Sequence, residues 1–191
     1  MKQRIKSLIR KFMNIIYEIR YIKKFDNVYL GKRVKIVRAR QIRFGRNVNI
    51  QHDNLIILHN INGNLIISDG CDIGSYSRIA AISNVFIDKN VITGPNVFIA
   101  DYNHNYLNID VPIKSGGNIV YDKGIRIGEG SWIGTNSVIV GNVSIGKHCV
   151  IGANSVVTKD IPDYCVVVGS PAKIIKKYHL KTMCWKKQDE L

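Results

Sequence analysis

The 191-residue chain has no long hydrophobic run and no paired cysteines. No stretch approaches the ~18 consecutive apolar residues typical of a membrane-spanning helix, so we predict no transmembrane segment. Its four cysteines lie far apart, without a CxxC motif and without a secretory signal ahead of them. This pattern favours reduced thiols in a soluble, cytoplasmic protein.

Features of a metal site and of a nucleic-acid-binding domain are also missing. The basic residues are not interleaved with stacking aromatics, which argues against nucleic acid as a partner. The histidines show no close pair at the spacing of a zinc site: His52, His59, His104, His148 and His179. We therefore predict no metal, although a site shared between subunits stays open.

An aliphatic residue instead recurs at every sixth position, at Ile127, Ile133, Ile139, Ile145, Ile151 and Val157. A period of six fits no helix but equals three strand periods, so all these side chains point the same way. Glycine follows most of them and allows a tight turn. Such a repeat cannot bury its apolar face alone, and stacking the units builds one core. The sequence therefore predicts a parallel β-helix of hexapeptide strands.

The repeat continues upstream with interruptions. Residues 30–50 contain early, irregular turns of the same pattern, and a step of eight predicts a two-residue bulge near residues 81–84. Between residues 99 and 125 the repeat vanishes, and the polar segment there contains Pro112 and paired glycines. We expect this segment to loop out of the coil, and long loops on regular scaffolds tend to carry function.

Positive charge is concentrated at one end of the chain. Residues 1–46 contain 15 Lys or Arg and 2 acidic residues, whereas residues 47–191 contain 13 and 12. Apolar residues at three- and four-residue spacing predict an amphipathic α-helix between residues 5 and 22. Its apolar stripe is expected to cap the first coil or to meet a neighbouring subunit. A second interpretation adds that its basic face, with the basic residues of 33–46, contacts anionic lipid headgroups or an anionic acceptor.

Over about residues 60–177 the chain resembles the hexapeptide-repeat acyltransferases. The most specific stretch is 127–177, where the elements WIG, IGANSVVTKDIP and GSPAKII follow one another as in the sugar O-acetyltransferases. The loop sequence ADYNHNY resembles the His-bearing loop of the polysaccharide-acetylating branch. The resemblance implies a left-handed β-helix, a homotrimer with active sites between subunits, and acetyl-CoA as the acyl donor.

The same resemblance makes His104 the candidate general base. A sugar hydroxyl must lose its proton as it attacks the thioester carbonyl, and a neutral imidazole suits that task. Asp101 is a candidate for orienting the imidazole, with Asn103 or a backbone carbonyl as alternatives. Tyr102 is a departure from the family, because related loops often carry another histidine there.

Further family positions concern coenzyme A. Trp132 matches the tryptophan beside the acyl group, and its place in the repeat predicts a side chain that points outward, toward a ligand or a neighbouring subunit. Positions that grip the pantetheine arm and the nucleotide correspond to Gly134, Thr135, Gly152, Ala153, Thr158 and Lys159. Lys173 and Lys176 match basic positions near the phosphates, although surface solvation explains either lysine equally well.

These patterns predict an all-β protein. Its expected parts are a basic amphipathic helix (1–26), a left-handed parallel β-helix of hexapeptide repeats (27–177) with an ejected loop at about 101–121, and a short helical C-terminal tail (178–191). The predicted activity is acetyl-CoA-dependent O-acetylation of a sugar hydroxyl on a cell-surface polysaccharide (capsule, exopolysaccharide or O-antigen) or its precursor. The expected location is the cytoplasm, and a peripheral place at the inner face of the cytoplasmic membrane stays open. N-acetylation of a nucleotide-linked amino sugar and a catalytically silent solenoid for assembly stay open as alternatives. The loop histidine, the outward tryptophan and the VTKDIP element together favour an enzyme.

Overall fold

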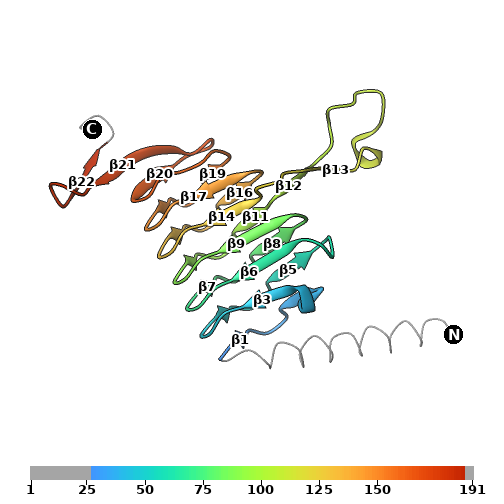
Figure 1. The fold of residues 1–191 in the computed structure, drawn as a ribbon, viewed down its shortest axis with the longest axis horizontal. Helices are drawn as coiled ribbons and strands as arrows, with labels where there is room; N and C mark the ends of the chain where they lie inside the picture. Colours follow the sequence, from blue (N-terminus) through green and yellow to red (C-terminus); the bar gives the residue numbers. More distant parts are fainter. Residues whose placement is uncertain (1–26, 188–191) are drawn as a thin grey trace.

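Three stacks of short parallel strands form the sides of a β-solenoid in the computed structural model, which describes residues 27–187 (Figure 1). The chain visits the three sheets in turn, and we call them faces A, B and C. One strand from each face makes a coil, and a corner is named by the two faces that it joins. Neighbouring strands within a face lie about 4.8 Å apart, so each coil adds that much to the length of the solenoid.

The strand bounds follow this order. Face A contains β1 (Tyr29–Leu30), β4 (Asn49–Ile50), β7 (Asp72–Ile73), β10 (Ile92–Thr93), β15 (Trp132–Ile133), β18 (Val150–Ile151) and β20 (Cys165–Val168). Face B contains β2 (Lys35–Val37), β5 (Leu55–Leu58), β8 (Arg78–Ala81), β11 (Phe98–Ala100), β16 (Val138–Val140) and β19 (Val156–Val157). Face C contains β3 (Ile42–Phe44), β6 (Asn64–Ile67), β9 (Asn84–Ile87), β14 (Ile125–Ile127) and β17 (Val143–Ile145). Short 3-10 turns are η1 (Ala39–Gln41) and η2 (Ile113–Ser115).

The hexapeptide positions form the core, as predicted. In β14, Ile125 and Ile127 are fully buried while Arg126 between them is exposed, which is the alternation expected of a strand with one wet face. The six aliphatic residues from Ile127 to Val157 are at most 2% exposed. Buried serines four residues after an aliphatic position of the repeat hydrogen-bond to carbonyls of the next coil: Ser137 Oγ donates to Gly152 O at 3.0 Å. The parallel solenoid predicted from the period is therefore confirmed.

The irregular coils at the start also belong to the solenoid. β1 pairs with β4, and β2 pairs with β5, so residues 30–50 form complete turns as expected. The two extra residues expected near 81–84, Ile82 and Ser83, form the corner between β8 and β9. Because the corners absorb such insertions, the strands on either side keep their register across the faces.

The predicted helical C-terminal tail is wrong over the part that the structure describes. Residues 173–187 form two antiparallel strands, β21 (Lys173–His179) and β22 (Cys184–Lys187), which extend face A beyond β20. The physical reason is the open edge of β20, whose N–H and C=O groups need partners that a strand supplies and a helix does not. The predicted N-terminal helix lies outside the described residues. Within residues 27–187, no helix is long and apolar enough to cross a membrane.

Candidate active site

The loop that carries His104 leaves the solenoid at the B/C corner of the fourth coil and projects away from its side (Figure 1). It begins as a hairpin in which β12 (Tyr102–His104) pairs with β13 (Asn118–Val120). His104 lies opposite Asn118 and is exposed. The backbone at the base of the loop is thus held by a strand ladder, while the imidazole is free to meet another molecule.

Asp101 fastens the base of this hairpin to the coil below. Its carboxylate is fully buried and accepts the backbone N–H of Ile82 at 2.7 Å and of Ser83 at 2.8 Å. Burial raises the pKa of this carboxyl, and the hydrogen bonds from the backbone oppose that rise. Among residues 27–187, no hydrogen bond joins Asp101 to His104, so the orienting role of Asp101 stays a prediction, and its contacts here are structural.

A second imidazole lies beside the hairpin. Tyr102 Oη is 3.2 Å from His59 Nε2, and the two rings meet edge to face with centroids 5.4 Å apart. His59 follows β5 at the B/C corner, two coils below Tyr102. Partial desolvation lowers the pKa of His59, and the charge of Arg78 lowers it further. The sequence did not predict this pair. His59 lies in an irregular coil, where the repeat does not show that Tyr102 of a later coil lies above it.

Trp132 lies on the outer surface of face A and is 50% exposed, so the predicted outward orientation is confirmed. Strand register places it in one outward column with residues of neighbouring coils, Ile92, Trp132, Val150, Val166 and Lys176. Three strand spacings separate Trp132 from Lys176, or about 14 Å. We call the part of this column from Trp132 to Lys176 the face A strip: it is apolar until it ends in a cation.

The other candidate coenzyme residues fall into two groups. Gly134, Thr135, Gly152 and Ala153 lie at the A/B corner beside the strip, and Lys173 begins β21 next to them. A side chain at Gly134 has no room, since a Cβ there would be 2.6 Å from the Ala153 nitrogen. Thr158 and Lys159 follow β19 at the B/C corner, on the side of the hairpin. The predicted site residues of one chain are therefore divided between two corners of the solenoid, A/B and B/C.

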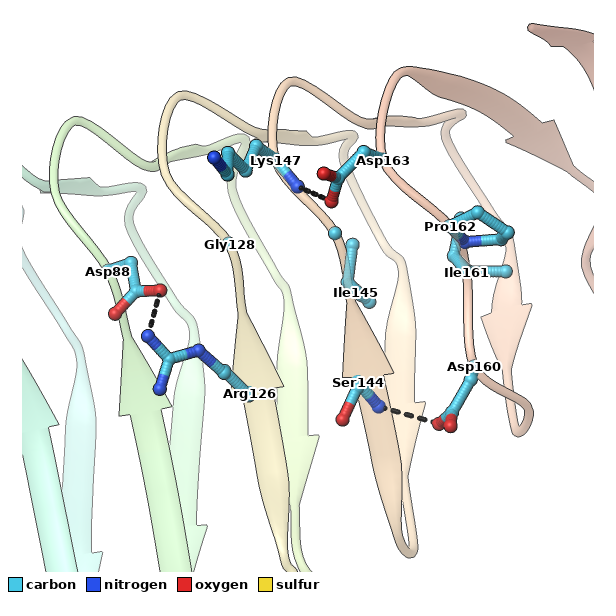
Figure 2. Close-up of a pocket in the computed structure, with 11 residues that line it drawn as sticks. Asp88, Arg126, Gly128, Ser144, Ile145, Lys147, Asp160, Ile161, Pro162 and Asp163 are labelled. Carbon is cyan, nitrogen blue, oxygen red and sulfur yellow. Dashed lines mark hydrogen bonds and ion pairs between the residues drawn. The ribbon is translucent and has the colours of Figure 1, made fainter.

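A shallow groove of about 460 Å³ on face C contains none of these residues (Figure 2). Arg126 and the acidic groups of the groove are already engaged: Arg126 pairs with Asp88 at 2.7 Å, and Asp160 accepts the Ser144 N–H at 2.8 Å. Asp163 accepts the Lys147 N–H at 2.9 Å. Asp160 and Asp163, the acidic residues of the KDIPD segment (159–163), thus link the last coil to the one before it. In the described part of the chain, no three potential metal ligands cluster together.

Comparison with known proteins places the chain in a family. Residues 124–159 match the family described as bacterial transferase hexapeptide (six repeats). The chain is 37% identical over 131 residues to WbbJ of Escherichia coli (strain K12), which is named as a lipopolysaccharide biosynthesis O-acetyl transferase; the match covers 65% of this chain and 66% of WbbJ. It is 34% identical over 156 residues to Rv3034c of Mycobacterium tuberculosis, which is named as an acetyltransferase, with 80% of this chain and 51% of Rv3034c covered.

Among solved structures, a mutant of the N-acyltransferase AntD from Bacillus cereus has a similar fold. Its complex with dTDP-4-amino-4,6-dideoxyglucose and coenzyme A matches with a TM-score of 0.66 at 21% identity, covering 83% of this chain and 84% of AntD. The chain belongs to the hexapeptide-repeat transferase family, as the sequence predicted. It spans between half and two thirds of the length of the two relatives named above.

Proposed function

We propose that the protein is an acetyl-CoA-dependent O-acetyltransferase of the cytoplasm that acts on a sugar hydroxyl of a cell-surface polysaccharide or its precursor. The observation that carries this proposal is the pair of exposed groups that the fold holds in place. His104 projects from an anchored hairpin, and Trp132 stands at one end of the face A strip. The name of WbbJ, an O-acetyl transferase of lipopolysaccharide biosynthesis, supports the choice of acceptor.

The face A strip suits an extended thioester coenzyme. Val150 and Val166 are half-buried and form an apolar floor between Trp132 and Lys176. The acyl group is assigned to the Trp132 end, and the phosphates to Lys176 and Lys173, which supply positive charge. Because the glycines of the A/B corner have no side chains, a pantetheine arm can approach the backbone at the edge of the strip.

His104 is assigned the proton transfers. Its neutral imidazole accepts the proton of the acceptor hydroxyl as the oxygen attacks the thioester carbonyl carbon. The tetrahedral intermediate then collapses, the carbon–sulfur bond breaks, and the imidazolium returns the proton to the departing thiolate. The products are an acetyl ester and free coenzyme A.

Two subunits are needed to bring these groups together. Within one chain the His104 hairpin leaves the B/C corner, whereas Trp132 faces outward from the opposite side, face A. A head-to-tail contact pairs one side of a subunit with the other side of its neighbour, and such contacts close into a ring when the rotation between subunits divides a full turn. We therefore propose a homotrimer with three sites, each with the B/C corner of one subunit against face A of the next.

N-acetylation of a nucleotide-linked amino sugar is the second candidate. The observation in its favour is the fold shared with AntD, whose structure holds a dTDP-linked amino sugar beside coenzyme A. The higher identity to WbbJ favours a hydroxyl acceptor, so O-acetylation is placed first.

Acetyl transfer from acetyl-CoA to a panel of glycans and nucleotide amino sugars tests this function. Coenzyme A release gives the rate, and mass spectrometry identifies the acetylated acceptor. Mild alkali removes an O-acetyl ester but spares an N-acetyl amide, so the same product separates the two candidates. Absence of both coenzyme A binding and transfer to any acceptor would contradict the proposed function.

A further inference from the structure

The first coil of the solenoid carries many positive charges and no negative one. Between residues 27 and 52 there is no Asp or Glu. All seven basic residues of this stretch are exposed: Lys32, Arg33, Lys35, Arg38, Arg40, Arg43 and Arg46. We call these seven residues the basic rim.

The basic rim occupies two faces and all three corners of the first coil. Lys35 is on β2 of face B, and Arg43 is on β3 of face C, each with an outward side chain. Arg33 lies at the A/B corner, Arg38 precedes η1 at the B/C corner, and Arg46 lies at the C/A corner. The charges therefore form a ring around one end of the solenoid and not a patch on one of its faces.

Only part of this charge is neutralised. Arg33 Nη2 donates to Asp53 Oδ2 at 2.6 Å, and Arg46 pairs with Asp69 at 3.6 Å. The guanidinium of Arg33 lowers the pKa of Asp53 to about 2, so that acid stays charged at neutral pH. Among residues 27–187, no ion pair involves Lys32, Lys35, Arg38 or Arg43. The ring thus keeps a net positive charge.

Coenzyme phosphates do not account for the basic rim. The lysines assigned to them, Lys173 and Lys176, are on β21, whereas the rim is on β1–β3 and the turns between them. These strands lie at opposite ends of the solenoid (Figure 1). The rim is therefore separate from the candidate active site.

We propose that the basic rim seats this end of the solenoid on an anionic membrane surface, with the solenoid axis upright on the bilayer. A plane pressed against the end of the solenoid meets the whole ring, whereas a linear polyanion lying along one face meets only the charges of that face. One coil is about 4.8 Å thick, which is less than the screening length of about 8 Å at physiological salt. All rim charges can therefore act on the same surface, and the long stems of Lys and Arg let their charged ends turn toward it.

Two further features fit a lipid surface. Tyr29 in β1 is 64% exposed at this end, and aromatic rings with a polar tip favour the membrane interface. Residues 1–26, which join the first coil at Asn27, contain eight Lys or Arg and two acidic residues in their sequence. Their charge adds to that of the rim at the same point of the chain.

Co-sedimentation of the full chain with vesicles tests the proposal. The probes are vesicles of phosphatidylcholine alone and of phosphatidylcholine mixed with phosphatidylglycerol. Wild-type protein should bind only the anionic vesicles and dissociate as salt rises. A rim variant with Lys32, Lys35, Arg38 and Arg43 replaced by Gln should bind about 10²- to 10³-fold more weakly, since each cation near such a surface contributes about fivefold.

A matched variant controls for net charge. Replacing Lys89, Lys123, Lys177 and Lys181 with Gln removes the same charge from exposed positions outside the first coil, and should leave vesicle binding nearly unchanged. Equal binding by the rim and control variants would overturn the proposal, as would absence of wild-type binding at low salt. Binding to heparin in solution without binding to anionic vesicles would also overturn it, in favour of a soluble polyanion. Circular dichroism of the rim variant checks that it is folded.

An upright orientation makes a separate prediction. An environment-sensitive fluorophore on Val37→Cys, in a Cys184→Ser background, should enter an apolar environment on vesicle binding, because Val37 is exposed in the first coil. The same fluorophore on Cys184, which is exposed in β22, should stay in water. Equal spectral shifts at both positions would contradict end-on binding.

Discussion

Tyr102 Oη lies 3.2 Å from His59 Nε2, which joins the hairpin that carries His104 to a coil two layers below it. Asp101, the preceding residue, is bound to the backbone of Ile82 and Ser83 in the layer between. Two consecutive residues therefore anchor the hairpin at its base. His104 follows them by two positions in β12, so its placement depends on both anchors.

Tyr102→Phe tests the first anchor. The variant keeps the ring contact with His59 but loses the hydroxyl, and one hydrogen bond contributes about 1 kcal/mol, or about fivefold. If Tyr102 positions His104, kcat should fall by up to that factor while KM for acetyl-CoA and the free energy of unfolding barely change. Tyr29→Phe, at an exposed tyrosine of the first coil, is the control. A Tyr102→Phe enzyme with the wild-type kcat would show that the hydroxyl does not position the hairpin.

The lowered pKa of His59 predicts a dependence of stability on pH. Desolvation and Arg78 favour the neutral ring in the folded state. The unfolded chain, with an ordinary pKa of about 6.5, therefore binds the proton at a higher pH than the folded protein does. The contribution of His59 is present above about pH 6.5 and is lost as the pH falls through its folded pKa. Urea unfolding should show a shallower loss of stability between about pH 7.5 and about pH 5 for His59→Gln than for wild type; identical slopes would refute this.

Asp101→Ala should destabilise the protein. It removes both acceptors for the Ile82 and Ser83 N–H groups, and an unsatisfied buried donor costs about 1–3 kcal/mol. Asp101→Asn keeps one acceptor oxygen and should lose less. Asp110→Ala, at an exposed position of the hairpin, should be neutral. The measurement is the free energy of unfolding in urea, and an unchanged value for Asp101→Ala would mean that the corner holds without its carboxylate.

The four thiols should differ sharply in reactivity. Cys71, Cys149 and Cys165 are buried, and burial raises the pKa of each, to about 11 for Cys71. Cys184 is exposed in β22. Because the thiolate is the reactive form, Ellman's reagent should titrate one thiol quickly in the native protein and all four after denaturation. Rapid reaction of more than one native thiol would mean that the core opens readily.

The solenoid and its core could be predicted from the repeat because each hexapeptide places an aliphatic residue on the inner side of a strand. From Ile127 to Val157 the spacing alone placed six residues inside, and the outward orientation of Trp132 followed from its place in the unit. The C-terminal strands were missed because they are set by the open edge of β20, which lies outside the repeat.

Contacts between distant coils could not be predicted from the sequence. His59 and Tyr102 are 43 residues apart, and the number of residues per coil varies between them, so no periodicity relates the two. Asp101 was predicted to orient His104 because the two are close in sequence, and that role stays a prediction. The sequence did not reveal that the Asp101 oxygens bind the backbone of the preceding coil. The excess charge of residues 27–46 was evident, whereas its ring arrangement depends on where the corners fall.

In the proposed homotrimer, each site combines His104 of one subunit with Trp132 of the next. His104→Ala should lower acetyl transfer by about 10²-fold or more, the usual effect of losing a general base, with coenzyme A binding intact. His148→Asn is the control, because His148 is exposed at a corner with φ 48°, a conformation that Asn tolerates. Trp132→Glu should also inactivate the enzyme, by placing a charge at the acyl end of the face A strip. Light scattering should give a trimer mass for every variant.

The most direct measurement is the activity of hybrid trimers. His104→Ala and Trp132→Glu chains, each with its own affinity tag, are co-expressed and purified through both tags in turn. In a head-to-tail ring every such hybrid has one interface where an intact His104 meets an intact Trp132, so activity should recover to about a third of wild type. Hybrids no more active than the two parent variants would contradict a site shared between subunits.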